Sequence, residues 1–430
     1  MTLAILADDL TGACDSAVAF ARRGLATRVL LAPRPVAVGA CERVDVVAVD
    51  ADSREVTRRL AVSRTEIAAR ALRTPEATRL FKKVDSTLRG HVGPEILACL
   101  RAWDLPLALL CPAFPATGRW VQGGEIFVDG RGSLGQVARL AGLPKDRRTG
   151  HVDLATLRAG TDAVEAALGR LARTGARVVI ADADTPGHLT TLVEAATRLS
   201  EPVLLAGAGG LASALAAWTV RDRAGGGVAA WTGGASATTA TADGSPWLVV
   251  AGSQTEVTHH QIVELARAGA EVIQLDVDEL LAHRSVAEHA GRRAALLLGQ
   301  GVTPVLRLVV PPLADGTPGR GPRLEDRASR ALARACFTAV LEAPPAGLFL
   351  TGGATARASL LRLGVSGLRP ESEPLPGIAA GVAIGGRWDG RPVITKAGGF
   401  GAPDAIRRLV RPRSPGRISL PTARPSPPVA

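Results

Sequence analysis

The chain has 430 residues, of which 47% are hydrophobic, 21% charged and only 3% aromatic, and its formal net charge is +11. This length exceeds the size at which a single hydrophobic core stops growing, so we expect two domains. The basic charge is scattered as arginine over predicted helix faces, for example at Arg58, Arg59, Arg64 and Arg70. With few aromatic side chains to stack on bases, this composition argues against a nucleic-acid-binding protein, although a basic field favours an anionic substrate.

The sequence lacks the signals of a secreted, membrane or metal-binding protein. Its cysteines, Cys14, Cys41, Cys99, Cys111 and Cys336, form no C-x-x-C pair and have no metal spacing. We therefore expect buried thiols in a reducing compartment. No secretory signal and no uninterrupted apolar run of roughly 18 residues is present. We predict a cytoplasmic protein with no membrane span and no protein metal site.

Strand-like and helix-like segments alternate through residues 1–221. Short apolar strands are expected at 2–7, 44–49, 79–84, 107–111, 177–181 and 203–206, and helices at 12–23, 56–72 and 95–103. Gly24 suits the C-cap of the first helix. Such alternation predicts a parallel or mixed sheet with helices on its faces.

The alternation stops at residues 222–246, where glycine clusters among Ala, Ser and Thr predict a flexible linker. A second pattern follows, with strands at 247–251, 272–275, 304–308 and 347–350 and helices at 256–267, 286–298 and 325–341. Residues 311–322 read as a Pro/Gly-rich loop and residues 411–430 as a disordered tail. We predict an α/β protein of two domains, 1–221 and 247–410, with parallel or mixed sheets and the active site in the cleft between them.

Two acidic residues, Asp8 and Asp9, follow the first predicted strand and precede a helix that opens near Thr11. One carboxylate suffices to cap a helix, whereas two adjacent carboxylates repel each other unless a ligand or cation compensates. Open α/β sheets bind ligands at the carboxyl ends of their strands. We therefore interpret the acidic pair as part of a site.

The densest polar segment is Lys83-Val84-Asp85-Ser86-Thr87-Leu88-Arg89-Gly90, at the end of the third predicted strand. Its lysine and arginine can neutralise a carboxylate or phosphate, and Asp85 can accept a hydroxyl proton. Arg54, after the second strand, has the chemistry of a bidentate carboxylate clamp. The proline-rich turn at 111–119 ends in Arg119, which we expect to reach into the same pocket.

Three glycine-containing turns end predicted strands of the second domain. They are Ala251-Gly252-Ser253, Thr351-Gly352-Gly353-Ala354-Thr355-Ala356 and Lys396-Ala397-Gly398-Gly399-Phe400-Gly401. Glycine turns at helix N-termini let the backbone approach phosphates closely. The G-x-x-x-x-G-K-[ST] pattern is absent from the sequence, which argues against a P-loop protein.

Taken in chain order, A-D-D-L-T-G-A-C-D, K-K-V-D-S-T-L-R-G, C-P-A-F-P-A-T-G-R, A-G-S, T-G-G-A-T and T-K-A-G-G-F-G resemble the motifs of the four-carbon acid sugar kinase family. The resemblance covers residues 1–410 and is specific, because several long motifs occur in register. It implies an N-terminal sugar-acid-binding domain and a C-terminal nucleotide-binding domain. The implied activity is ATP-dependent phosphorylation of threonate, erythronate or an oxo-tetronate at the 4-hydroxyl.

The resemblance also assigns roles to positions of this chain. The substrate side takes Asp8, Asp9, Arg54, Lys83, Asp85, Ser86 and Arg89, and the nucleotide side takes Ser253, Gly352, Gly353, Ala354, Thr355 and Gly398. Arg54, Lys83 or Arg89 is expected to bind the substrate carboxylate. Asp9 or Asp85 is expected to orient or deprotonate the attacking hydroxyl. Mg²⁺ is expected on ATP phosphates and water rather than in a protein cage, and closure of the two domains about the linker is expected to exclude water.

One departure from the family pattern keeps other functions open. Ala354 stands where the family turn usually carries Asp or Glu. A sugar-acid-binding protein that has lost phosphoryl transfer is therefore an alternative, as is a kinase for another small hydroxy acid. A basic nucleic-acid-binding protein is the least favoured. The expected partners are a small sugar acid and ATP, with no nucleic acid and no membrane; a homodimer, the stereoisomer used and the identity of the base are left open.

Overall fold

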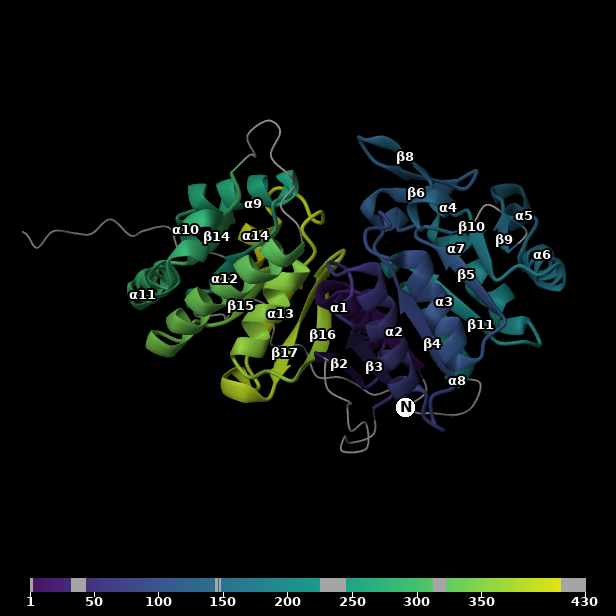
Figure 1. Ribbon diagram of the computed structural model, residues 1–430, viewed down its shortest axis with the longest axis horizontal. Coiled ribbons are helices and arrows are strands. Elements are labelled where there is room, and N and C mark those ends of the chain that lie inside the picture. Colours follow the sequence, from purple (N-terminus) through teal and green to yellow (C-terminus); the bar gives the residue numbers. More distant parts are fainter. Residues whose placement is uncertain are drawn as a thin grey trace, which may run out of the picture.

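The computed structural model describes residues 3–31, 44–143, 146, 148–224, 245–311 and 322–410. Two lobes lie side by side in Figure 1, the N-terminal one coloured purple to teal and the C-terminal one green to yellow. Most of the predicted linker, nearly all of the predicted Pro/Gly-rich loop and the whole predicted tail lie outside the described residues. Within the described part of the chain, no helix is both long and apolar enough to cross a membrane.

Within its described residues, the N-terminal lobe is built on eight parallel strands. They are β1 (Leu3–Ala7), β2 (Thr27–Leu31), β3 (Val46–Asp50), β4 (Arg79–Lys83), β5 (Leu107–Cys111), β9 (Thr149–Val152), β10 (Val178–Ala181) and β11 (Val203–Gly207). Their order is β2-β3-β1-β4-β11-β5-β10-β9. The strands read as continuous apolar runs because helices cover both faces of the sheet. The chain first steps from β1 to one side and later to the other, so β1 and β4 flank a topological switch point, where such sheets bind ligands.

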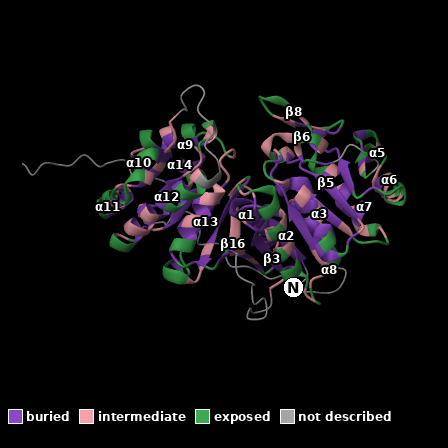
Figure 2. Ribbon diagram, viewed as in Figure 1, coloured by how far each residue is buried: buried purple, intermediate pink, exposed green. Residues whose placement is uncertain are grey.

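The helices of this lobe are α1 (Leu10–Ala21), α2 (Arg58–Leu72), α3 (Val92–Trp103), α4 (Val137–Leu140), α5 (Leu154–Arg158), α6 (Thr161–Arg173), α7 (Pro186–Arg198) and α8 (Gly209–Ala224). Two of them show opposite patterns. Helix α1 is buried on every side from its first residue to Phe20, as expected of a helix without a polar face. Helix α2 buries only Ala61, Thr65, Ala69 and Leu72 and exposes its arginines. In Figure 2, buried residues gather in the strands and the inner helices, and exposed residues lie on the outer helices.

The C-terminal lobe repeats the architecture on a smaller scale. Its strands are β12 (Leu248–Ala251), β13 (Glu271–Asp276), β14 (Pro304–Val309), β15 (Leu348–Thr351), β16 (Gly367–Leu375), β17 (Ile378–Ile384) and β18 (Pro392–Lys396). Its helices are α9 (Glu256–Arg267), α10 (Val277–Ala282), α11 (Arg284–Gly299), α12 (Pro322–Glu342), α13 (Gly353–Arg362) and α14 (Ala405–Val410), with a 3₁₀ turn, η3, at Gly386–Trp388. Strands β13-β14-β12-β15-β18 are parallel, and β17 and β16 continue the sheet in antiparallel fashion.

The two lobes share one sheet. Strands β2 and β16 pair in antiparallel fashion, with Leu30 opposite Gly367 and Val29 opposite Leu368, and so join the described strands of both lobes into one sheet of fifteen. Glycine is needed at this junction, because a Cβ atom on Gly367 would lie 2.5 Å from the Val29 carbonyl oxygen. The α/β class and the two lobes confirm the prediction. The joining of both lobes in a single sheet was not foreseen.

A small antiparallel sheet stands apart at the carboxyl end of the N-terminal lobe's strands. It consists of β6 (Arg119–Gln122), β7 (Glu125–Val128) and β8 (Gly132–Gln136), preceded by a 3₁₀ turn, η2, at Pro115–Thr117. The β6–β7 turn has positive φ at both Gly123 and Gly124, the geometry of a two-residue hairpin. Both glycine amides donate to the buried carboxylate of Asp182, which follows β10, at 2.8 and 2.9 Å. The sequence predicted a proline-rich turn at 111–119 with Arg119 reaching into the pocket, but not the three strands that follow.

Candidate active site

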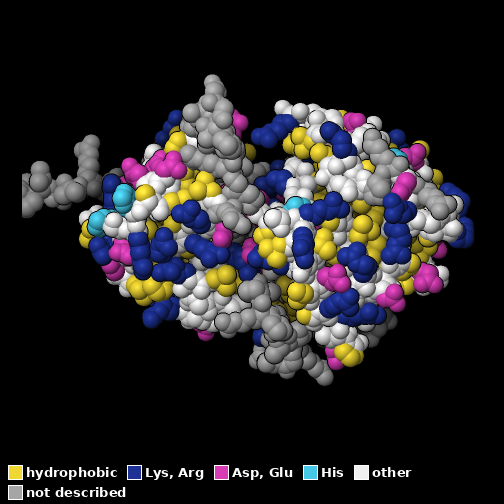
Figure 3. All heavy atoms as spheres, viewed as in Figure 1, with side chains coloured by type: hydrophobic (Ala, Val, Ile, Leu, Met, Phe, Trp, Pro, Cys, Tyr) yellow, Lys and Arg dark blue, Asp and Glu magenta, His cyan; other side chains and the backbone are white. Residues whose placement is uncertain are grey.

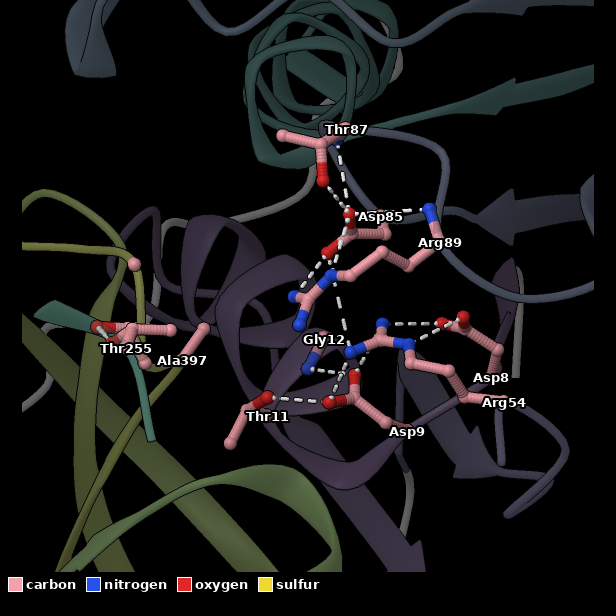
Figure 4. Close-up of polar contacts among 12 residues, drawn as sticks. Asp8, Asp9, Thr11, Gly12, Arg54, Asp85, Thr87, Arg89, Thr255 and Ala397 are labelled. Atoms are coloured by element: carbon pink, nitrogen blue, oxygen red, sulfur yellow. Dashed lines mark hydrogen bonds and ion pairs between the residues drawn. The ribbon is translucent and has the colours of Figure 1, made fainter. Parts of the chain in front are cut away.

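Arg54 joins the two acidic residues that follow β1 (Figure 4). Its Nε and Nη2 each donate to Asp8 at 2.8 Å, and its Nη1 and Nη2 donate to Asp9 at 2.7 and 2.9 Å. All three side chains are at least nine-tenths buried. The cation that compensates the acidic pair is therefore a residue of this chain, held by two carboxylates in bidentate geometry.

These contacts fix the charge of the cluster. Burial by itself disfavours the ionised form of Asp8, but the Arg54 guanidinium and the nearby Lys82 and Lys83 hold its pKa below its usual range. The same carboxylates raise the pKa of Arg54, in spite of its own burial. Asp9 also caps α1, because its carboxylate accepts from the Gly12 amide at 2.8 Å and from the Thr11 hydroxyl at 2.7 Å.

Asp85 is held in a tight turn after β4. Its carboxylate accepts from the Thr87 amide at 3.0 Å and from the Thr87 hydroxyl, and Arg89 donates through Nη2 at 2.7 Å and Nε at 3.2 Å. Leu88 takes a left-handed conformation, with φ of 63°, to close this turn. Burial opposes the charge, but Arg54, Arg89 and Thr87 lower the pKa of Asp85 well below its usual range.

The two adjacent lysines at the end of β4 point to opposite faces of the sheet, as the period of a strand requires. Lys82 is fully buried and pairs with Glu95 of α3 at 2.9 Å. The Lys83 ammonium turns to the other face, 3.8 Å from an Asp15 carboxylate oxygen on α1. Lys83 is therefore the lysine that reaches the site, as predicted.

One cavity gathers these groups between the lobes. From the N-terminal lobe it takes Asp9, Arg54, Lys83, Asp85 and Ser86, with Thr11, Gly12, Asp15, Phe114, Ala208 and Gly209; from the C-terminal lobe it takes Ala397 and Phe400. Asp8 lies behind Arg54, and Arg89 stands at the rim, with 54% of its side chain exposed. Asp15 was not predicted as a site residue, although a lone acid on the otherwise apolar α1 was a signal that could have found it.

On the nucleotide side, the turn after β18 fits closely against the start of α9. A Cβ atom on Gly398 would lie 2.0 Å from the Ser253 hydroxyl oxygen. The Gly398 carbonyl accepts from the hydroxyls of Thr255 at 2.8 Å and Thr258 at 3.0 Å. Sequence reasoning had named Ser253 and Gly398 but neither threonine.

The turn after β15 brings α13 to the acidic pair. A Cβ atom on Gly353 would lie 2.3 Å from Asp9 Oδ2, so the N-terminus of α13 lies against the substrate side. Thr355 fills the space beside Gly252, where a Cβ atom would lie 1.9 Å from its hydroxyl oxygen. Ala354 is half-buried at the start of this helix. The predicted nucleotide residues and the acidic pair therefore converge.

The side chain of Lys396 lies within the glycine turn at 396–401 and donates hydrogen bonds to its carbonyls. Its ammonium donates to the carbonyls of Ala397, Gly398 and Phe400 at 3.0, 2.9 and 3.2 Å, and to Thr258 Oγ1 at 3.3 Å. The side chain is fully buried, and burial lowers the pKa of Lys396 to about 7. This residue was part of a quoted motif but was not assigned a role.

Side chains of both lobes make contacts between the lobes near the cavity. Arg119 donates to the Gly399 carbonyl at 3.0 Å and lies over the Phe400 ring, with 4.5 Å to its centroid. Arg357 of α13 pairs with the buried Asp50 at the end of β3, at 2.6 Å. The space-filling view in Figure 3 shows a hollow between the lobes with Lys and Arg side chains beside it.

Comparison with known proteins divides the chain into the same two parts as the two lobes. The family model of a sugar-binding N-terminal domain matches residues 3–215, and that of a nucleotide-binding C-terminal domain matches residues 248–406. The chain is 35% identical to a D-threonate kinase of Cupriavidus necator (94% of this chain, 96% of the relative) and 32% identical to a D-erythronate kinase of Heliobacterium modesticaldum (93% and 94%). It is 33% identical to a 3-oxo-tetronate kinase of Methylobacterium radiotolerans (95% and 99%).

The chain belongs to the four-carbon acid sugar kinase family. The resemblance drawn from its motifs is thereby confirmed. A solved structure from Salmonella typhimurium LT2, described as a putative tRNA synthase, has the same fold as this kinase, with a TM-score of 0.73, 23% sequence identity and coverage of 95% of this chain and 98% of that one. At that identity the likeness concerns the fold alone.

The fit of Gly398 gives a test of the nucleotide side of this kinase. We expect Gly398→Ala to raise the KM for ATP at least about tenfold, because its methyl group collides with Ser253 and displaces the turn. Gly399→Ala is the matched control, since a Cβ atom there has only a distant neighbour, Arg119 Nη2 at 3.7 Å. Initial rates against ATP concentration measure both variants. Equal KM values for the two would show that this turn does not bind ATP.

Proposed function

We propose that the kinase transfers the γ-phosphoryl group of ATP to the 4-hydroxyl of a four-carbon sugar acid in the cavity between the lobes. The observation that carries this proposal is the composition of that cavity, where Asp9, Lys83 and Asp85 face Ala397 and Phe400 of the nucleotide-binding lobe. The names of the relatives support a four-carbon acid as the substrate class.

On the substrate side, Lys83, Ser86 and Arg89 are donors at the cavity that are not engaged by the acidic pair. Lys83 and Ser86 line the cavity, and Arg89 stands at its rim. We propose that Lys83 and Arg89 bind the substrate carboxylate, since both carry the positive charge that an anion requires. Arg54 is engaged by Asp8 and Asp9, so we propose that it holds the acidic pair in place while Asp9 and Asp85 orient substrate hydroxyls.

On the nucleotide side, we propose that Ser253, Gly352, Gly353, Ala354, Thr355 and Gly398 hold ATP. Backbone amides at the N-terminus of α13 suit phosphate oxygens, which the helix dipole also favours. The Gly353 position next to Asp9 supports this placement, because it brings a phosphate on that helix within reach of the substrate side.

Mg²⁺ fits this site as the companion of ATP. Within the described residues, no cluster of three or more His, Cys, Asp or Glu side chains has the arrangement of a metal site. Asp8, Asp9 and Asp85 already accept from arginines. We therefore propose that Mg²⁺ is held by phosphate oxygens and water, where it neutralises phosphate charge.

We also propose the cytoplasm as the compartment, since ATP is available there and Cys14, Cys99, Cys111 and Cys336 are buried free thiols, as in a reducing environment. A homodimer remains a proposal that sedimentation at several protein concentrations would test.

The decisive experiment is ATP consumption with Mg²⁺ against the D and L forms of threonate and erythronate and their 2-oxo and 3-oxo derivatives. We expect turnover of one member of this panel, with D-threonate tested first because three relatives carry the name D-threonate kinase. Silence across the panel, with ATP still bound by calorimetry, would point to another hydroxy acid. Silence without ATP binding would favour the non-catalytic alternative, and Ala354→Glu would then be the first reversion.

A further inference from the structure

One carboxylate in the cavity differs from all its neighbours. Both oxygens of Asp9 accept from Arg54, and both oxygens of Asp85 accept from Arg89. Within the part of the chain that the structure describes, neither oxygen of Asp15 accepts a hydrogen bond. Its side chain is only 5% exposed, so water from bulk solvent does not replace the missing donors. A buried acceptor without a donor is costly, which indicates that a ligand supplies one.

The position of Asp15 supports that interpretation. It lies one helical turn after Thr11 on α1, so both side chains face the same cavity. Opposite them is Gly209 at the start of α8, where a Cβ atom would lie 2.5 Å from Asp15 Oδ2. The Lys83 ammonium, at 3.8 Å, is beyond hydrogen-bond distance but close enough to attract an anion. The carboxylate therefore lies between Gly209 and Lys83 and lines the cavity.

We propose that the Asp15 carboxylate is the proton acceptor of the phosphoryl transfer, an inference that rests on the proposed function. The substrate hydroxyl oxygen forms a new bond to the γ-phosphorus of ATP. The bond from that phosphorus to the bridging β–γ oxygen breaks, and ADP leaves with its electron pair. The proton of the attacking hydroxyl passes to an Asp15 oxygen and leaves to solvent after product release.

The electrostatics agree with this division of roles. A general base works best when its pKa is near the working pH. Burial raises the pKa of Asp15 to about 6, while Arg54 and Arg89 lower that of Asp85. Asp85 is therefore too weak a base, which leaves it the orienting role.

The charged groups around Asp15 come from several elements. Lys83 of β4 favours its ionised form, and Glu373 of β16 and the neighbouring Asp9 oppose it. The charge of Asp15 also acts on the guanidinium of Arg119 in β6. Glu373 is itself held by Arg22 of the C-terminal end of α1, at 2.7 Å. Because these charges also affect the pH profile, the profile of an Asp15 variant is compared with that of a variant in which all of them are kept.

The test is Asp15→Asn in the full-length kinase, with the exposed Asp162→Asn as the matched control. Wild type is first assayed on the acid panel, and a wild type that phosphorylates none of these acids would refute the proposed function itself. With an active wild type, we expect Asp15→Asn to lower kcat about 100-fold or more and to remove the loss of kcat below pH 6. The KM for ATP and the thermal midpoint are expected to change little. A kcat within about fivefold of wild type, with the acid limb retained, would overturn the proposal.

A second variant decides the matter if Asp15→Asn does not fold. Lys83→Gln removes the cation beside Asp15, so we expect the acid limb of kcat to move to higher pH by about one unit. An acid limb that stays at the wild-type pH in this variant would show that another group accepts the proton and would overturn the proposal.

Discussion

Replacement of Arg54 by Met is expected to destabilise the kinase by about 3–5 kcal/mol and to lower kcat/KM at least about 10³-fold, because it leaves Asp8 and Asp9 buried without their counter-charge. The guanidinium makes four hydrogen bonds to the pair, and a methionine of similar length makes none. Urea unfolding at pH 7 and a coupled ADP assay measure the two effects.

The pH dependence of the Arg54→Met effect has a defined sign. In wild type, Arg54 holds the pKa of Asp8 below its usual range, so this group stabilises the fold above pH 4 and loses that contribution as the pH falls. The variant lacks the contribution at every pH. The difference in unfolding free energy between variant and wild type should therefore stay nearly constant from pH 7 to about 5 and shrink as the pH falls through 4 and below.

Two further variants control the Arg54 experiment. Arg70→Met removes an exposed i,i+4 ion pair with Glu66, and we expect it to cost less than about 0.5 kcal/mol. Adding Asp8→Asn to Arg54→Met removes one uncompensated charge and should restore part of the stability but little of the activity. If Arg54→Met behaved like Arg70→Met, the buried pair would not support the site.

Asp85→Asn is expected to lower kcat at least about 10³-fold while leaving ATP binding nearly unchanged. The asparagine amide cannot accept the two donors of Arg89 and also the Thr87 donors, so Arg89 loses its position at the rim of the cavity. The residues that we propose to hold ATP belong to the other lobe, which this change does not touch. Calorimetry of ATP binding and a single-turnover assay separate the two outcomes.

The matched control for Asp85→Asn is Asp104→Asn. Asp104 is an exposed C-cap residue of α3 with φ of 55°, a left-handed conformation that asparagine adopts readily. The residual activity of Asp85→Asn should keep the acid limb near pH 6 that Asp15→Asn is expected to remove, because we propose that Asp85 orients the hydroxyl and that Asp15 takes its proton. Normal turnover by Asp85→Asn would remove Asp85 from the chemistry.

The elements with the clearest sequence periodicity were predicted almost to the residue. Strand β5 and helix α9 have the expected bounds, since an apolar run between turns and a capped amphipathic segment are local properties. Strand β16 was missed because it contains Pro370 and Pro374, residues that usually end a strand. Its pairing with β2 and β17 overrides that local signal.

The sequence also predicted which residues of the candidate site lie together, because this follows from the direction of the strands. Parallel strands bring their carboxyl ends to one edge, so polar residues after β1, β3 and β4 had to converge there. The partners within that cluster were not predictable. Arg54 is engaged by the acidic pair, and among the described residues Asp15 has no hydrogen-bond donor. Both facts depend on distances between segments far apart in the chain.

The sequence by itself determined the α/β class, the two lobes and the residue types of the site, because strand and helix periods, turn glycines and motif order are written along the chain. Tertiary structure alone decided the continuous sheet through β2 and β16, the approach of Gly353 to Asp9 and the lack, among the described residues, of a hydrogen-bond donor to Asp15. The physical reason is that charge, burial and hydrogen bonding act through space. Whether a carboxylate holds an arginine or accepts a proton is therefore settled by its neighbours in the fold and not by its neighbours in the sequence.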